Sequence, residues 1–307
     1  MTLRAAVLGH PISHSKSPAL HRAAYAHLGV ALDYSAIDVT EEALRAFMAR
    51  VREDVRQGGS WRGLSVTMPL KTGMVREVDE VRGVGRALGV VNTVAFEPPA
   101  PGDSAGVTRL VGYNTDVAGI VNALRNAGAA SAPTAAILGG GGTSAAAIAA
   151  LKELGAPDAD IFVRDISRAT EARAAAAAVG LAVRILPLGG AAGAIAGADV
   201  VISTLPPRAA DPLAEEVGRL FAQRSEEPAP ETVPVRPGVL LDVAYDPWPS
   251  RIAAAWQDAG GTVVPGLEML IYQAVEQVRL FTGLGQAMPA EVIDVMCDAV
   301  GAPRRVF

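Results

Sequence analysis

Cysteine is almost absent from this sequence, since Cys297 is the only one among 307 residues. A single cysteine excludes an intrachain disulfide and any metal site that is built from several thiolates. Such a low cysteine content is typical of proteins from a reducing compartment, so we expect a cytoplasmic protein.

Long apolar segments and blocks of positive charge are also missing. Residues 126–151 carry no charge, but Pro133 and four glycines interrupt them, and the apolar start of the chain turns within ten residues. We therefore expect neither a membrane span nor a signal peptide. The net charge is −5 and no basic run exceeds the pair Arg304 and Arg305, so nucleic acid is not an expected partner.

Lysine is also scarce. Only Lys16, Lys71 and Lys152 are lysines among the 27 basic residues, and the other 24 are arginines. Because arginine supplies the surface charge, each lysine is a candidate for a chemical role. A lysine ammonium can lose a proton near neutral pH in a suitable environment, whereas a guanidinium cannot. Lys152 is an ordinary polar residue of a helical stretch, but Lys16 and Lys71 lie in segments without helical spacing.

Hydrophobic residues make up 50% of the chain, and their spacing alternates between strand and helix. In the first 113 residues, short apolar runs alternate with helical segments, one of which is capped by Thr40. This alternation predicts a largely parallel sheet in a domain of its own. The expected strands are residues 3–8, 34–39, 63–66, 90–96 and 108–113, and the expected helices are residues 18–28, 41–57 and 74–88.

The second half of the chain repeats this alternation after a helix at residues 117–127, with a Pro- and acid-rich surface excursion expected at 224–238. Two final helices, 266–282 and 289–300, have no strand between them, so we expect them to pack on the first domain. The predicted fold is α/β with two domains, an N-terminal α/β domain over 1–115 and 267–307 and a Rossmann-like, doubly wound domain over 116–266. The strands expected in the second sheet are residues 135–138, 160–163, 182–186, 199–203 and 239–243.

The stretch TAAILGGGGTSAAAIAALKEL, residues 134–154, predicts a strand, a tight turn and a helix. Glycines at such a turn let the backbone approach a ligand, and the free N–H groups at the helix start favour an anion. A dinucleotide pyrophosphate is therefore the expected ligand. The pattern is G-x-G-x-x-S, so a tight turn without a ligand is the alternative. The residues expected at the pyrophosphate are Gly139, Gly140, Gly141, Gly142, Thr143 and Ser144.

The end of the next expected strand indicates which dinucleotide binds. A carboxylate at this point accepts hydrogen bonds from the ribose of NAD, whereas arginines pair with the additional phosphate of NADP. Arg164 and Arg168 favour NADP, and Asp165 opposes it unless its side chain points away. A solvated strand end that binds nothing is the alternative. We expect NADP, and NAD stays open.

Polar residues suited to a hydroxyl or ketone substrate lie in the loops of the first half and at the joint between the halves. In open parallel sheets, the loops after the strands form the ligand site, so these residues could converge on one cleft. The candidates are Ser13, Ser15, Ser17, Thr67, Lys71, Asn92, Asn114, Thr115 and Asp116.

Six motifs occur in order along the chain: GHPISHSKSP (9–18), GLSVTMPLK (63–71), VVNT (90–93), GYNTD (112–116), the glycine turn and GLEMLIYQA (266–274). In order and spacing they resemble the shikimate dehydrogenase family over essentially the whole chain. The resemblance implies reversible, NADPH-dependent reduction of 3-dehydroshikimate to shikimate, a step in chorismate and aromatic amino-acid biosynthesis. It implies small-molecule partners only, and we expect a monomer or homodimer.

The resemblance also implies a role for each matching residue. Ser15 and Ser17 would hold the substrate carboxylate, and Lys71 and Asp116 would bind the substrate and act as the acid–base pair. The residues expected at the ring hydroxyls are Thr67, Asn92 and Gln273. The remaining residues expected at the cofactor or the pocket wall beside it are Thr204, Tyr245, Gly266 and Met269.

Two departures and three alternatives stay open. The family usually has Asn-Val-Thr where this chain has Ser65-Val66-Thr67, so we expect either a weaker contact or a water at Ser65. The residues around Asp165 also leave an NAD-dependent quinate/shikimate dehydrogenase open, and a ligand sensor without turnover is an alternative of another class. Asp116 could serve only as a helix cap. All four histidines fall in the first 27 residues, but two prolines interrupt that segment, so we expect no metal.

Overall fold

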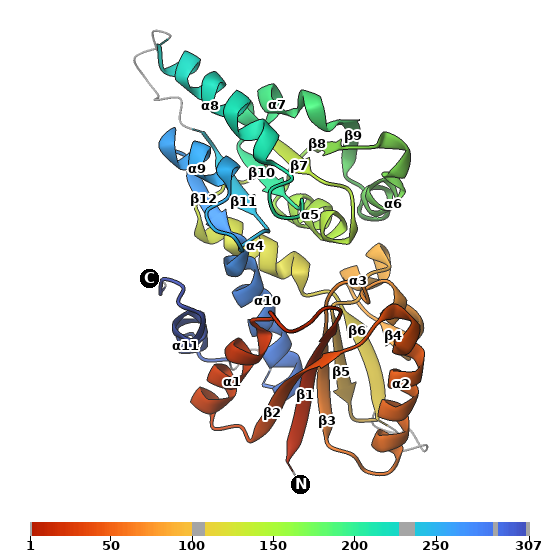
Figure 1. Ribbon diagram of the computed structural model, residues 1–307. Helices are drawn as coiled ribbons and strands as arrows, with labels where there is room; N and C mark the ends of the chain where they lie inside the picture. Colours follow the sequence, from red (N-terminus) through yellow and green to blue (C-terminus); the bar gives the residue numbers. More distant parts are fainter. Residues whose placement is uncertain (1, 100–107, 227–236, 285–287, 305–307) are drawn as a thin grey trace. The chain divides into compact units, whose positions relative to one another are not determined.

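The computed structural model describes residues 2–99, 108–226, 237–284 and 288–304, and the chain divides into two compact units (Figure 1). The first unit comprises Met1–Asp116 and Leu270–Phe307, and the second comprises Val117–Met269. The sequence predicts substrate binding and catalysis for the domain at 1–115 and 267–307 and NADP binding for the domain at 116–266, and these roles stay predictions. No helix of the described residues is both long and apolar enough to cross a lipid bilayer.

The first unit contains a six-stranded sheet in the order β2-β1-β3-β5-β6-β4. Only β5 runs antiparallel to its neighbours, so the largely parallel sheet is confirmed. Because of this reversal, the start of β5 lies beside the ends of β3 and β6, where Thr93 pairs with both Ser65 and Tyr113. The strands are β1 (Leu3–Gly9), β2 (Leu32–Asp38), β3 (Trp61–Val66), β4 (Glu80–Val81), β5 (Thr93–Glu97) and β6 (Arg109–Tyr113).

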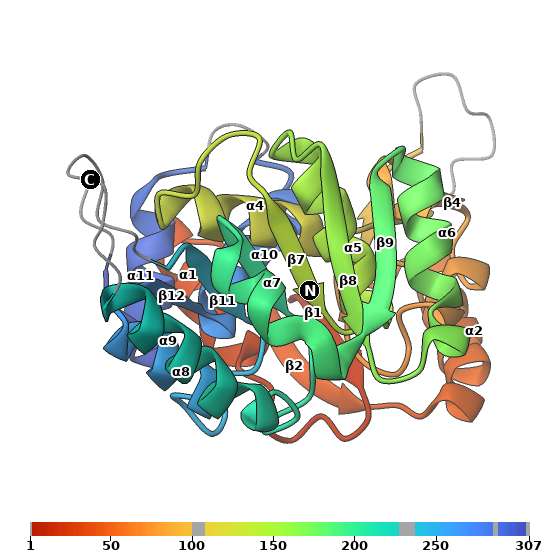
Figure 2. The ribbon, with the colours of Figure 1, turned by 90° about the horizontal axis from the view of Figure 1, so that it is seen from above.

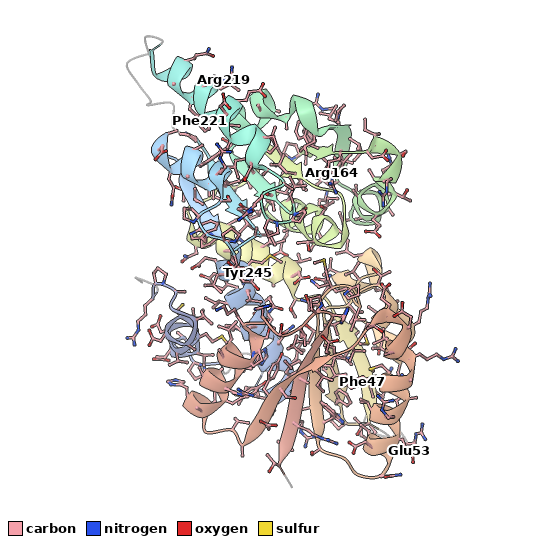
Figure 3. The ribbon with its side chains drawn as sticks, viewed as in Figure 1. Phe47, Glu53, Arg164, Arg219, Phe221 and Tyr245 are labelled. Carbon is pink, nitrogen blue, oxygen red and sulfur yellow. The ribbon has the colours of Figure 1, made fainter. Side chains whose placement is uncertain are left out.

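Helices cover both faces of this sheet. Leu64 of β3 packs in an apolar cluster with Phe47 of α2 (Figure 3), whereas the neighbouring Gly63 lies so close to Phe281 of α10 that a Cβ would collide with its ring. The C-terminal helices therefore return to the first unit, as expected, and α11 packs against α1. The helices are α1 (Ser17–Leu28), α2 (Glu41–Arg56), α3 (Val84–Leu88), α10 (Gly266–Thr282, shared with the second unit) and α11 (Glu291–Val300).

The expected helix at residues 74–88 is wrong. The chain forms a short 3₁₀ turn, Gly73–Arg76, then β4 and the five-residue α3. Two observations explain the break. The Asp79 carboxylate accepts a hydrogen bond from the Leu110 amide and thereby ties the segment to β6. Gly83 has φ +56° and ψ −142°, a conformation that side chains with a Cβ rarely adopt and that no helix contains.

The second unit contains an all-parallel sheet in the order β12-β11-β10-β7-β8-β9. This is the doubly wound nucleotide-binding order, so the predicted Rossmann-like fold is confirmed. The order reverses between β7 and β10, and loops diverge there to leave room for a ligand. The strands are β7 (Ala135–Leu138), β8 (Asp158–Val163), β9 (Ala182–Pro187), β10 (Val200–Ser203), β11 (Val239–Asp242) and β12 (Thr262–Pro265).

The sequence missed β12, a four-residue edge strand that ends in Pro265. The excursion expected at 224–238 lies mostly outside the described residues, and its first three residues belong to α8 instead. Helix α8 packs beside α9 (Figure 2), with Phe221 edge-on to Trp256. The helices are α4 (Asp116–Asn126), α5 (Gly142–Glu153), α6 (Thr170–Val179), α7 (Ala191–Gly197), α8 (Asp211–Glu226) and α9 (Arg251–Asp258).

Candidate active site

The polar residues of the first unit gather at one edge of its sheet. Thr67 and Lys71 follow the end of β3, Asp116 follows the end of β6, and Asn92 precedes the reversed strand β5. The end of β1 lies alongside, because a Cβ on Gly9 would collide with the Thr67 side chain. The topology therefore brings together residues that are far apart in the sequence.

Lys71 and Asp116 form an ion pair, with 2.5 Å between Lys71 Nζ and Asp116 Oδ2. Their side chains are only 17% and 7% exposed, so the pair lies in a largely desolvated place, where electrostatic attraction is stronger than in bulk water. Asp116 is the first residue of α4, yet its carboxylate bonds to the side chains of Lys71 and Asn92. It is therefore not merely a helix cap.

The buried Asn92 amide holds the other oxygen of this carboxylate. Asn92 Nδ2 donates to Asp116 Oδ1 at 2.8 Å and to Gln273 Oε1 at 3.3 Å. Asn92 Oδ1 accepts from the Thr115 backbone amide at 2.7 Å and from the Thr93 hydroxyl at 2.8 Å. Since a backbone N–H can only donate, the oxygen of the Asn92 amide must face Thr115 and its NH₂ must face Asp116.

Ser15 and Ser17 lie at the start of α1. Ser15 is half-buried and Ser17 is buried, and the Ser17 amide donates to Ser15 Oγ at 3.3 Å. Asp38 holds the loop that carries them, because its carboxylate accepts from His10 Nδ1 at 2.7 Å and from the Ile12 amide at 3.3 Å. Two hydroxyls at a helix N-terminus suit an anionic group such as a carboxylate.

Sequence reasoning missed Gln277, which lies one turn after Gln273 on α10 and is 1% exposed. Its Oε1 accepts from Ser65 Oγ at 2.6 Å and from His21 Nε2 at 3.1 Å, and its Nε2 donates to Thr93 Oγ1 at 3.0 Å. The i, i+4 spacing of two glutamines was the available signal. The Ser65 oxygen, which the sequence left open, also accepts from Tyr34 at 2.6 Å.

His21 is neutral and buried beneath this network. Its ring stacks on Tyr34 with 3.9 Å between centroids, and its Nδ1 bonds to the Tyr25 hydroxyl at 2.9 Å. Burial lowers the pKa of His21 from 6.5 to about 3, and the hydrogen bond with Gln277 opposes this only in part. Among the described residues, no cluster of histidine, cysteine and acidic side chains is arranged to hold a metal ion.

The low pKa of His21 predicts acid sensitivity. Between pH 6.5 and about 3 the unfolded chain binds a proton at this residue that the folded chain does not. As the pH is lowered through this window, the free energy of unfolding should therefore decrease, and His21 should contribute about 1.4 kcal/mol per pH unit to this decrease. In urea unfolding at several pH values, His21→Gln should weaken the dependence, and His27→Gln on the exposed face of the same helix is the control. An unchanged dependence in His21→Gln would contradict a neutral His21.

In the second unit, a cavity of about 640 Å³ opens beside the glycine turn. Gly139 has φ +112°, and a Cβ there would lie 2.4 Å from Thr204 Oγ1. The helix that follows, α5, has no side-chain cap, so its first N–H groups are free to bind an anion. The lining residues are Gly139, Gly140, Gly141, Val163, Arg164, Asp165, Arg168, Ala169, Glu171, Thr204, Leu205 and Pro206.

Gly139→Ala should strain this turn. The positive φ and the collision with Thr204 predict a loss of about 1–3 kcal/mol in the free energy of unfolding, together with weaker dinucleotide binding. Gly193 in α7 is the matched control, because a Cβ there meets nothing within 4 Å and alanine favours a helix. Urea unfolding and a dinucleotide titration would measure both effects, and equal stability of the two variants would refute the argument.

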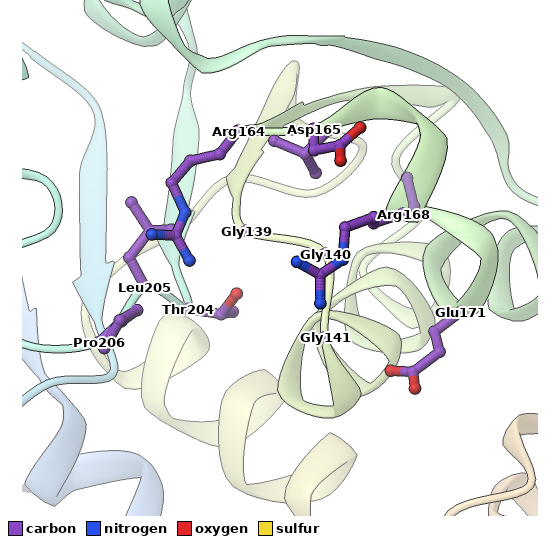
Figure 4. A pocket seen from close by; sticks show the side chains of 12 residues that line it. Gly139, Gly140, Gly141, Arg164, Asp165, Arg168, Glu171, Thr204, Leu205 and Pro206 are labelled. Atoms are coloured by element: carbon purple, nitrogen blue, oxygen red, sulfur yellow. The ribbon is translucent and has the colours of Figure 1, made fainter.

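The two arginines and Asp165 point in different directions (Figure 4). The guanidinium groups of Arg164 and Arg168 reach into the cavity, whereas the Asp165 carboxylate is directed away from them. Asp165 Oδ1 accepts from the Ser167 hydroxyl at 2.6 Å and from the Ser167 amide at 2.9 Å. These bonds lower the pKa of Asp165 and keep its carboxylate in the turn. The cavity therefore presents positive charge to a phosphate.

The other residues expected at the cofactor lie around the carboxyl end of this sheet. The buried Ser144 bonds to Thr204 at 2.7 Å, so its hydroxyl fixes the turn. Tyr245 is half-buried in the loop after β11, and Met269 is buried in α10. Gly266 begins α10 so close to the Val243 carbonyl that a Cβ would collide with it. Gly142 and Thr143 begin α5. Cofactor contact by these residues stays a prediction.

Two family models match parts of this chain, and a sequence relative matches most of it. Residues 7–94 match the family model described as the shikimate dehydrogenase substrate binding domain, and residues 266–294 match the shikimate 5'-dehydrogenase C-terminal domain. A relative named shikimate dehydrogenase (NADP(+)), from Rubrobacter xylanophilus, is 36% identical over 91% of this chain and 90% of its own.

Solved structures agree with the sequence relatives. Shikimate dehydrogenase of Mycobacterium tuberculosis is 36% identical, with a TM-score of 0.78 over 97% of this chain and 99% of its own. Shikimate 5-dehydrogenase of Thermus thermophilus, solved in complex with NADP(H) and shikimate, is 32% identical, with a TM-score of 0.72 over 97% and 100% of the two chains. With identity above 30% along nearly its whole length, this chain belongs to the shikimate dehydrogenase family.

Proposed function

We propose that this protein catalyses the reversible, NADPH-dependent reduction of 3-dehydroshikimate to shikimate, a step of chorismate and aromatic amino-acid biosynthesis. The observation that carries the proposal is the pair of Lys71 and Asp116, desolvated and 2.5 Å apart beside the Asn92 amide. The pair lies in the unit whose sequence matches the substrate binding domain of the family. The names of the relatives give the substrate and the cofactor.

In the first unit, hydroxyl and amide side chains bind the substrate, and the ion pair transfers the proton. The hydroxyls of Ser15 and Ser17 bind the substrate carboxylate, and the side chains of Thr67, Asn92 and Gln273 bind the ring hydroxyls. Lys71 donates a proton to the ketone oxygen during reduction and removes it from the alcohol during oxidation. Asp116 holds the ammonium of Lys71 through Oδ2 and shares the same substrate hydroxyl. A positioned acid–base group of this kind typically contributes about 10²–10⁴ to the rate.

The second unit suits a dinucleotide with an additional phosphate. The glycine turn lets the backbone approach the pyrophosphate, and Arg164 and Arg168 would pair with the phosphate on the adenosine ribose. When bound, NADPH supplies the hydride for the reduction. Asp165 does not oppose this choice, because its carboxylate is committed to Ser167. We therefore favour NADP over NAD.

Initial rates of the purified protein would test the proposal against its nearest rival. Shikimate and quinate are each combined with NADP and NAD, and kcat/KM is measured for the four combinations. Shikimate with NADP should give the highest value. A highest value for quinate with NAD would overturn the proposal in favour of a quinate/shikimate dehydrogenase. Binding of shikimate and NADP without turnover in any combination would indicate a sensor. A cytoplasmic location and a monomeric or dimeric state stay predictions.

A further inference from the structure

The orientation of the Gln277 side chain can be deduced from its partners. Gln277 Nε2 lies 3.3 Å from the backbone carbonyl of Asn92, which can only accept, so this atom must be the NH₂ group. Gln277 Oε1 therefore accepts both the Ser65 proton and the His21 Nε2 proton. The amide is fully committed within the protein, and none of its hydrogen bonds is left for a substrate.

A directional chain of hydrogen bonds connects this amide to the catalytic pair. Gln277 donates to Thr93 Oγ1 at 3.0 Å, and Thr93 then donates its proton to Asn92 Oδ1 at 2.8 Å. The Thr115 backbone amide donates to the same Asn92 oxygen at 2.7 Å, so the two bonds together turn the NH₂ of Asn92 toward Asp116 Oδ1, whose other oxygen binds Lys71. Gln277, Thr93 and Asn92 are all at most 1% exposed, so water does not compete for these bonds.

We propose that Gln277 and Thr93 are positioning residues that, together with the Thr115 backbone amide, hold the Asn92 amide in its orientation and, through it, the Asp116 carboxylate. This inference rests on the proposed function, because it assigns Asn92 to the substrate and Asp116 to the acid–base pair. Gln277 sets the direction of this relay, the chain of hydrogen bonds from Gln277 through Thr93 to Asn92. Because its NH₂ occupies Thr93 Oγ1 as a donor, the Thr93 proton is free to point toward Asn92. The bonds of Gln277 to Ser65 and His21 hold the glutamine itself in place.

Thr93→Val removes the relay hydroxyl and keeps the shape of the side chain. One buried hydrogen bond that steers a catalytic group predicts a decrease of about tenfold in kcat for shikimate oxidation, with the KM for NADP unchanged. Thr93→Ser, which restores the hydroxyl, should recover most of the rate. Tyr25→Phe is the matched control, because it removes a buried hydroxyl at the far end of the same network, beyond His21. It should lower stability and leave kcat at the wild-type value.

Gln277→Glu reverses the relay in a pH-dependent manner. An ionised carboxylate at this position can only accept, so the Thr93 hydroxyl would donate to it and no longer to Asn92 Oδ1. The carboxylate would also repel the backbone carbonyl of Asn92. A protonated carboxyl group can donate as the amide does. The activity of this variant should therefore be low at high pH and recover as pH falls through the pKa of the introduced carboxyl group, a limb that the wild type lacks. The other titratable groups that face this position are His21, Tyr25 and Tyr34. The control for added charge is Gln257→Glu on the exposed face of α9.

The wild-type rate keeps this inference separate from the proposed function. If the wild type oxidises shikimate with NADP while Thr93→Val matches its kcat, the positioning role is refuted and the proposed function stands. Equal decreases in kcat for Thr93→Val and Tyr25→Phe would also refute it, because they would indicate general destabilisation. If Gln277→Glu fails to fold, the comparison of Thr93→Val with Thr93→Ser still decides. If the wild type does not turn over, the proposed function fails first.

Discussion

Replacing Lys71 with alanine is expected to lower kcat about 10²–10⁴-fold, with a much smaller effect on the binding of shikimate. In the proposed reaction the ammonium is the proton donor for the ketone, and it lies 2.5 Å from Asp116 in a place where both side chains are largely buried. Substrate binding depends mostly on the hydroxyls and amides around it, so shikimate should still bind. Steady-state kinetics for kcat and a calorimetric titration for binding would separate the two effects.

Lys152→Ala is the control for this experiment, because Lys152 is exposed on α5 and donates to the backbone carbonyl of Gly180 in the second unit. It should keep the wild-type kcat. A Lys71→Ala variant with an unchanged kcat would remove Lys71 from the mechanism. A variant that loses shikimate binding and kcat in equal measure would make Lys71 a binding residue without a role in proton transfer.

Replacing Arg164 and Arg168 together with alanine is expected to lower kcat/KM for NADPH by about 10²-fold and to leave kcat/KM for NADH nearly unchanged. The two cofactors differ only in the phosphate on the adenosine ribose, and hydrogen bonds to a charged group contribute about 1.5–3 kcal/mol each, or about tenfold or more per bond. Both guanidinium groups reach into the cavity beside the glycine turn. The double variant should therefore lose its preference for NADPH.

Arg173→Ala is the matched control, because Arg173 is an exposed arginine on α6, which follows the same loop, and it does not line the cavity. It removes positive charge from the same region and should preserve the preference for NADPH. If kcat/KM for both cofactors falls equally in the double variant, the two arginines contact a group that NADPH and NADH have in common. That result would contradict their assignment to the additional phosphate.

Local signals in the sequence predicted most of the elements correctly. Thr40 caps α2 by accepting from the Ala43 amide, as expected, and Gly29 ends α1 in the left-handed conformation. Periodicity failed where tertiary contacts decide. The segment 74–88 has helical composition, but pairing of Glu80 and Val81 with β6 and the conformation of Gly83 prevent a helix. The edge strand β12 has only one buried residue, Val264, so it lacks the buried apolar run by which the equally short β7, β10 and β11 were predicted.

The sequence predicted most residues of the candidate site, but not all of their hydrogen-bond partners. The rarity of lysine and the family resemblance both singled out Lys71, and the structure pairs it with Asp116 as a salt bridge. The resemblance did not single out Gln277: its spacing from Gln273 places both on one face of α10, but the sequence does not show that this face reaches the start of β5. The direction of Asp165 was also undetermined, because it depends on the local turn with Ser167 and not on composition.

The most direct test of the central claim is the reduction of 3-dehydroshikimate by NADPH with the purified protein. The absorbance of NADPH is followed over time, and the product is identified by chromatography against authentic shikimate. The proposed function predicts that NADPH is consumed in equal amount to the shikimate that appears, and that NADH supports a much slower reaction. Binding of both ligands with no loss of NADPH would contradict it.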